Sequence, residues 1–168
     1  MATPNTEITE LGLQTFLKLS ARLTGFSEVE LLERGMLESY YYTIMKENDQ
    51  DLVRNFFQKA KEILGGDPAE IDRKICADFI HEQHIECGKP APPLNTLPYQ
   101  GLAQRIILMW YTGNWTTMNG LDKNISEQAR TAAVSAEAYK SGLIWTVAET
   151  HPAGARYPGY QSWRIKPF

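Results

Sequence analysis

The sequence lacks the features that mark several common classes of protein. No stretch of its 168 residues approaches the roughly 18 consecutive apolar residues of a membrane-spanning helix. Its formal net charge of -3 provides no basic excess, which argues against a protein that binds nucleic acid. The opening residues, MATPNTEITE, lack the charged and apolar regions of a signal peptide. Its two cysteines do not indicate a redox compartment.

The sequence also lacks the motifs that bind common cofactors or carry nucleophilic catalysis. It contains no G-x-G-x-x-G fingerprint, no Walker A loop, no G-x-S-x-G element and no C-x-x-C pair. A dinucleotide site also needs a strand before the glycine-rich turn, and no strand pattern precedes the glycines of this chain. We therefore expect no catalytic residue, no cofactor and no functional metal in this chain, which would not be an enzyme by itself.

One cluster of metal-ligating residue types leaves an alternative open. His81, His84 and Cys87 follow one another at intervals of three residues. Each such step rotates a helical side chain by roughly 60°, so the three side chains would fan across the surface. A solvated helix face is the favoured interpretation. The alternative is an independent helical enzyme that uses this cluster with a metal.

Helical periodicity is what the sequence does contain, with 43% hydrophobic and 22% charged residues as in an ordinary globular domain. Ser27 and Glu30 have the spacing of a capping box, so a helix should begin there. We expect an all-α, single-domain bundle of about five to six helices over 1–168. The expected helices cover 8–24, a segment from 27 with Val29, Leu32, Met36 and Tyr40 on one stripe, 49–64, a segment from 67, 102–113 and 135–149.

Two features organise the second half of the chain. The segment 88–98 contains four prolines and should form a stiff connector within the domain, because helical apolar spacing resumes directly after it. The helix over 102–113 is apolar on nearly every side, which predicts a central, buried helix. Gly113 permits the close approach of a neighbouring element, and Gly142 leaves a gap for another backbone or a bulky side chain.

The segment 150–168 differs from the rest, and we expect it to form an irregular arm. Its prolines and glycines exclude a helix or a sheet interior, yet it carries aromatic rings that each gain roughly 1.5–3 kcal/mol when buried. Aromatic side chains with arginine are enriched at protein interfaces. The arm therefore packs either on its own helices or on a partner. Its candidate partner-binding residues are Tyr157, Tyr160, Trp163, Arg164, Phe168 and His151.

Several motifs in this region carry a resemblance to a known family. They are the Tyr-x-x-Gly-Leu-x-Trp element from Tyr139 to Trp145 and the His-Pro-x-Gly-x-x-x-Pro-Gly element from His151 to Gly159. With the earlier runs ILMWYTGNW and FLKLSARLTG, they cover most of 16–163. The chain resembles the small subunit of bacterial membrane-bound FAD-dependent sugar and alcohol dehydrogenases, the sorbitol dehydrogenase small-subunit family.

The resemblance implies a helical, non-catalytic subunit that binds no flavin itself. It would accompany a large flavoprotein subunit that carries FAD and, in many complexes, a cytochrome c subunit. It would assist the maturation, stability or export of that partner, contact the membrane only indirectly and lie in the periplasm as part of the complex. Many family members open with a twin-arginine signal; here either that signal has been removed from the sequence, or the partner supplies it and carries the chain out of the cytoplasm. A self-associating helical scaffold is a further alternative.

Overall fold

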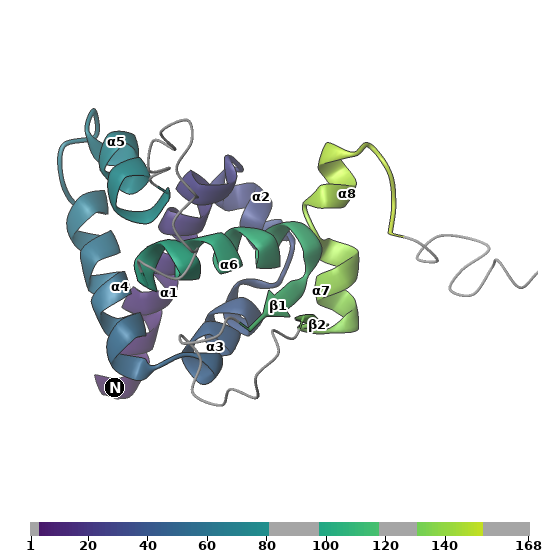
Figure 1. The fold of residues 1–168 in the computed structure, drawn as a ribbon, viewed down its shortest axis with the longest axis horizontal. Coiled ribbons are helices and arrows are strands. Elements are labelled where there is room, and N and C mark those ends of the chain that lie inside the picture. The colour runs from purple at the N-terminus through teal and green to yellow at the C-terminus, as the bar shows by residue number, and fades with distance from the viewer. Residues whose placement is uncertain (1–3, 81–97, 118–130, 153–168) are drawn as a thin grey trace, which may run out of the picture.

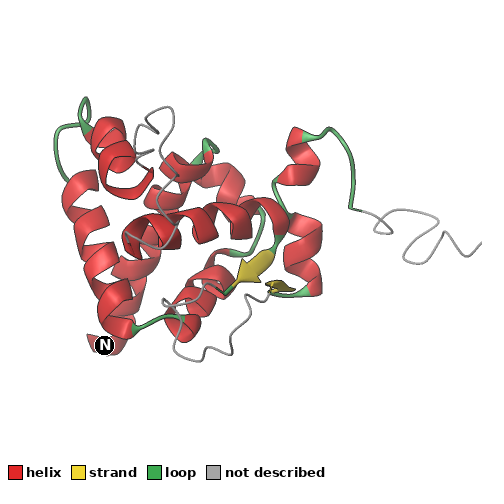
Figure 2. Cartoon of the chain, viewed as in Figure 1, coloured by secondary structure: helices red, strands yellow, loops and turns green. Residues whose placement is uncertain are grey.

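The computed structural model describes residues 4–80, 98–117 and 131–152, and within them the fold is all-α, as the sequence predicts (Figures 1 and 2). The one sheet in these ranges is an antiparallel pair of short strands. The elements in chain order are α1 (Pro4–Thr24), α2 (Glu28–Glu33), α3 (Leu37–Glu47), α4 (Gln50–Leu64), α5 (Ile71–Ile75), the π-helical turn η1 (Cys76–Ile80), α6 (Pro98–Thr112), β1 (Asn114–Thr116), β2 (Thr131–Ala133), α7 (Ala136–Ser141) and α8 (Ile144–Val147).

Helix α6 is the central helix of the described fold. It runs across the middle of the molecule, between η1 at one end and α7 at the other, with α1 and α4 packed against it (Figure 1). Leu102, Ile106, Met109 and Trp110 are all buried, which confirms the prediction of a core helix over 102–113. The helix is not buried on every side, however, because Leu108 is 45% exposed.

Two hydrogen bonds fix α6 against α1. The indole Nε1 of Trp110 donates to the Ser20 hydroxyl oxygen over 2.9 Å, and the Tyr111 hydroxyl donates to the carbonyl oxygen of Thr24 over 3.0 Å. Buried polar groups cost stability unless they are paired, so these bonds specify the rotation and height of α6 along α1. The position of the C-terminal end of α6 follows from them.

A buried arginine holds α6 to the end of α3 and to β1. The Nη2 of Arg105 donates to Asn48 Oδ1 over 2.7 Å, and its guanidinium lies 4.8 Å from the ring centroid of Trp115. Its Nε also donates to the Gly101 carbonyl oxygen. Arginine suits such a position because its planar, weakly hydrated group combines hydrogen bonding with stacking. The sequence analysis did not single out this residue.

The predicted helix from residue 27 begins as expected but is shorter than expected. The capping box is confirmed, with Glu30 N donating to Ser27 Oγ and Ser27 N donating to the Glu30 carboxylate. Gly35 then takes a left-handed conformation at φ 67°, so α2 ends and α3 starts afresh. The stripe predicted for a single helix is therefore wrong for two of its members: Val29 and Leu32 face solvent, and Leu31 is the buried residue of α2.

Other helix boundaries also differ from the sequence prediction. Asp67 does not cap a helix directly; its carboxylate accepts from Ala69 N in a turn, and α5 begins only at Ile71. The expected helix over 135–149 divides at Gly142 into α7 and α8. More and shorter helices result than the five to six expected. The His81, His84 and Cys87 cluster, and the connector up to residue 97, lie outside the described residues.

Alanine at Gly113, directly after α6, tests how closely the backbones of α6 and α7 pack. Gly113 has φ 72°, and a Cβ atom on it would lie 2.4 Å from the carbonyl oxygen of Ala138. Gly25 has a similar φ of 78° but open space around it. Gly25→Ala should cost about 1–2 kcal/mol for the left-handed backbone alone. Gly113→Ala should lower the free energy of unfolding by at least about 2 kcal/mol more, because α7 must also move.

Urea denaturation of both variants measures the difference. Equal losses of stability in Gly113→Ala and Gly25→Ala would contradict the close backbone contact between α6 and α7.

Candidate partner-binding surface

Most of the partner-binding residues expected from the sequence fall beyond the structural description. Tyr157, Tyr160, Trp163, Arg164 and Phe168 lie outside the described residues. His151 is described and exposed, with its Nδ1 3.2 Å from the carbonyl oxygen of Pro152. The candidate surface therefore consists of α7 and α8, which precede the arm, and of the elements on which these two helices pack.

Residues 138–143 are clamped onto the C-terminal end of α6. The Leu143 amide donates to the carbonyl oxygen of Trp110 over 3.0 Å, and the side chains of Ala138 and Leu143 are fully buried. A Cβ atom on Gly142 would lie 2.7 Å from the Tyr111 carbonyl oxygen, so a larger residue does not fit. This confirms that Gly142 leaves room for another backbone.

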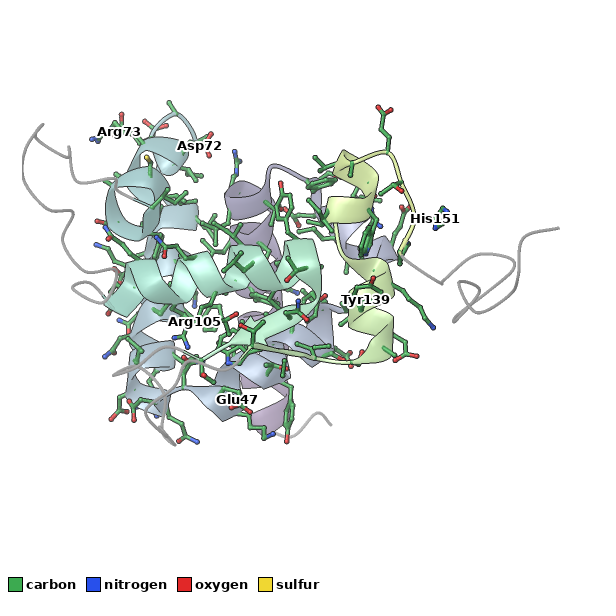
Figure 3. The ribbon with its side chains drawn as sticks, turned by 45° about the vertical axis from the view of Figure 1, so that its right-hand side comes forward. Glu47, Asp72, Arg73, Arg105, Tyr139 and His151 are labelled. Carbon is green, nitrogen blue, oxygen red and sulfur yellow. The ribbon has the colours of Figure 1, made fainter. Side chains whose placement is uncertain are left out.

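Helix α8 is held from two sides. The Trp145 indole Nε1 donates to the Tyr139 carbonyl oxygen over 2.7 Å, and the two rings meet edge to face with centroids 5.3 Å apart. On the other side, Nη2 of Arg34 donates to the Thr146 hydroxyl over 2.7 Å. The second bond joins the end of α2 to α8, although its two residues are 112 positions apart in the chain. In Figure 3, Tyr139 and His151 lie on the side of the molecule that α7 and α8 form.

Both of these connected helices present aliphatic side chains to solvent. Val29 and Leu32 of α2 are 64% and 51% exposed, and Ile144 and Val147 of α8 are 37% and 57% exposed. Each pair has the i, i+3 spacing that places two side chains on one helix face. Single exposed aliphatic residues need no explanation, but a pair on one face of each of two helices favours an interaction surface. We call Val29, Leu32, Ile144 and Val147 the aliphatic face.

Acidic side chains surround the α2 half of the aliphatic face. At about 100° per residue, Leu32 and Val29 lie between Glu28 and Glu33 around the helix. Glu30 is also exposed, and the hydrogen bond from the Ser27 side chain, followed by that from the Ser27 backbone, lowers the pKa of its carboxyl. The carboxylates give this surface a negative potential, so it favours an apolar segment that carries basic side chains.

The chain leaves α8 through a strained backbone turn. The amide of Thr150 donates to the Trp145 carbonyl oxygen over 2.9 Å, and the amide of Glu149 to that of Thr146 over 3.1 Å. This is the Schellman pattern that ends many helices, usually with glycine in the left-handed position. Here that position is Glu149, at φ 50°. The turn directs the chain towards His151 and the arm, and a side-chain-bearing residue there is less stable than glycine.

Other groups do not assemble a site within the described ranges. No three His, Cys, Asp or Glu side chains in them could share a metal ion, and Cys76 is exposed and free. None of the described helices has the length and apolarity to cross a bilayer. The Tyr40 hydroxyl and Trp115 Nε1 are buried and have no hydrogen-bond partner among the described residues, and burial raises the pKa of Tyr40. Both belong to the core around α6.

The sequence analysis missed the α2 half of the aliphatic face. It placed Val29 and Leu32 on an inward stripe, whereas Phe26 and Leu31, at the N′ and N4 positions of a hydrophobic staple around Ser27, indicate a different inward face. That motif puts Leu31 inward, and residues 29 and 32 then have to point elsewhere on so short a helix.

Comparisons of the chain with models of protein families, with curated proteins and with solved structures gave no match.

The left-handed turn at Glu149 yields a second test. Glu149→Gly should remove about 1 kcal/mol of backbone strain and slow hydrogen exchange of the Thr150 amide about fivefold. Glu149→Ala is the matched control, because it removes the same charge but retains the strain, and it should leave that exchange rate nearly unchanged. Nuclear magnetic resonance follows the amide directly. If both variants slowed exchange equally, charge rather than backbone strain would be responsible.

Proposed function

We propose that this chain is the non-catalytic small subunit of an FAD-dependent sugar or polyol dehydrogenase complex. It binds the flavoprotein large subunit, assists its maturation, stability or export, and leaves the chemistry to the FAD of that partner. The observation that carries the proposal is the aliphatic face, two exposed aliphatic pairs on α2 and α8, of which α8 directly precedes the arm that begins at residue 150. The sequence motifs from Tyr139 to Gly159 support the choice of partner.

The surface and the arm together suit stable association. Full burial of an aliphatic side chain contributes roughly 1.5–3 kcal/mol, and each of the four residues of the face has at least a third of its side chain left to bury. Association must also overcome the loss of translational and rotational freedom. Aromatic residues with arginine often supply the dominant contacts, so Trp163, Tyr160, Tyr157, Phe168 and Arg164 act as anchors, with His151 at the base of the arm.

Catalysis and electron transfer belong to the rest of the complex in this proposal. The sequence offers no dinucleotide fingerprint and no paired catalytic groups, so the flavin is held by the partner. Electrons from the substrate pass from that flavin towards a cytochrome c subunit or a quinone. The complex lies in the periplasm and meets the membrane through its other subunits.

A self-associating scaffold is the second candidate, because the aliphatic face would also fit a second copy of the chain. Light scattering on the purified chain separates the two functions. A monomer that enlarges only when the flavoprotein is added fits the accessory subunit, and a stable homo-oligomer fits the scaffold.

Capture of the partner tests the proposed function. An affinity-tagged chain should retain a flavoprotein from detergent extracts of the producing organism, identified by its flavin absorbance and by mass spectrometry. Leu32→Ser should weaken the complex about tenfold, which corresponds to about 1.4 kcal/mol. Leu108→Ser is the matched control, since Leu108 is 45% exposed and Leu32 51%, and it should bind as the unmodified chain does.

A variant of the arm completes this experiment. Trp163→Ala should cost on the order of 2 kcal/mol of complex stability while hardly changing the unfolding of the isolated chain. Retention of no flavoprotein by the unmodified chain, or undiminished retention by both Leu32→Ser and Trp163→Ala, would refute the proposal.

A further inference from the structure

Hydrogen-bond acceptors gather at the C-terminal end of α8. We propose that Val147, Ala148 and Glu149 together receive the guanidinium group of an arginine side chain on the partner of this chain. This inference rests on the proposed function in that it requires a partner, and it adds the chemical group by which that partner is recognised. Three acceptor groups, their exposure and one strained residue carry it.

The backbone at this helix end leaves two carbonyl oxygens available. The Schellman turn uses the carbonyl oxygens of Trp145 and Thr146. No hydrogen bond between described residues ends on the carbonyl oxygens of Val147 or Ala148, the last residue of α8 and its C-cap. Because the carbonyl groups of a helix point towards its C-terminal end, these two oxygens face the space beyond α8.

The next residue adds a carboxylate to the two carbonyl oxygens. The Cα atom of Glu149 lies about 3.8 Å from that of Ala148, as in any trans peptide. Its carboxylate forms no hydrogen bond or ion pair with the described residues. Val147, Ala148 and Glu149 are all exposed, so a partner can reach the three acceptors. Carbonyl and carboxylate oxygens only accept hydrogen bonds, so the set suits a positively charged group that only donates them.

Arginine meets this requirement better than lysine does. Its guanidinium carries five N–H donors in a planar fork, so it can pair with the carboxylate and still donate to a neighbouring carbonyl oxygen. The aliphatic stem of an arginine also packs on apolar side chains. Val147, which is 57% exposed, and Ile144, which is 37% exposed, provide such side chains on the same helix.

The identity of residue 149 favours a role in binding over a role in stability. Glycine is more stable than glutamate in a left-handed conformation, and Glu149 has φ 50°. Its carboxylate also follows two carbonyl groups whose oxygens carry partial negative charge. Both features destabilise the free chain, and a bound cation offsets the second. Strained residues of this kind gather where proteins hold ligands or partners.

A peptide titration of the full chain tests the inference without the partner. The probe is acetyl-leucyl-arginine amide, and the control peptide carries citrulline, the neutral isostere of arginine. At constant ionic strength, the arginine peptide should shift the amide resonances of Glu149 and Thr150 about threefold more than that of Glu137, an exposed glutamate in the first turn of α7. The citrulline peptide should shift them no more than that of Glu137.

Two variants assign the response to the carboxylate. Glu149→Gln should abolish the preferential shift, and the matched control Glu137→Gln should retain it. Glu149→Gly should also lose the response although it unfolds at a higher urea concentration, because glycine relieves the strain but removes the acceptor. Equal shifts at Glu137 and Glu149, or equal responses to the two peptides, would overturn the inference.

Capture of the flavoprotein separates this inference from the proposed function. Glu149→Gln should retain about fivefold less flavoprotein than the unmodified chain does, and Glu137→Gln should retain the same amount. Equal retention by Glu149→Gln and the unmodified chain would overturn the inference and leave the proposed function standing. Retention of no flavoprotein by the unmodified chain would refute the proposed function, and the peptide titration would then decide the inference by itself.

Discussion

The close contact between the backbones of α6 and α7 is the constraint on which the C-terminal half of the described structure depends. Gly113 and Gly142 lack side chains where the carbonyl oxygens of Ala138 and Tyr111 approach. This contact fixes α7, and with it the direction in which α8 leaves the body. Since α6 is itself fixed against α1 by the Trp110 hydrogen bond, the orientation of α8 is set by the core.

The aliphatic face follows from that placement. Helix α8 meets the end of α2 through Arg34 and Thr146, and α8 buries none of its four residues. Leu31 supplies the buried side of α2, so Val29 and Leu32 are left in solvent. The apolar surface with acidic flanks, and the basic, aromatic segment that follows later in the sequence, each have the composition of a binding surface. Interfaces with these features bind through a few buried anchors, with charges that select the partner and speed association.

The sequence predicts those parts of the fold that depend on residues close together in the chain. The capping box at Ser27, the core helix α6 and the helical class could all be predicted, because each depends on short-range spacing. The break at Gly35 could not be predicted, because it depends on a left-handed backbone conformation that glycine permits but does not require. The division at Gly142 could not be predicted either, because it depends on a tertiary contact with the Tyr111 carbonyl oxygen. The error at Val29 and Leu32 arose from the break at Gly35, since their stripe required an unbroken helix. Five of the six candidate arm residues lie beyond the described ranges, and their role stays a prediction.

A site-specific photo-crosslink tests the central claim, that the aliphatic face binds the flavoprotein, most directly. A benzophenone amino acid at position 32 can be activated in the extract of the producing organism, with the same group at position 108 as the reference. The account predicts that position 32 forms a covalent product containing a flavoprotein large subunit, and that position 108 forms none. A flavoprotein crosslink from position 108 but not from position 32, or none from either, would contradict it.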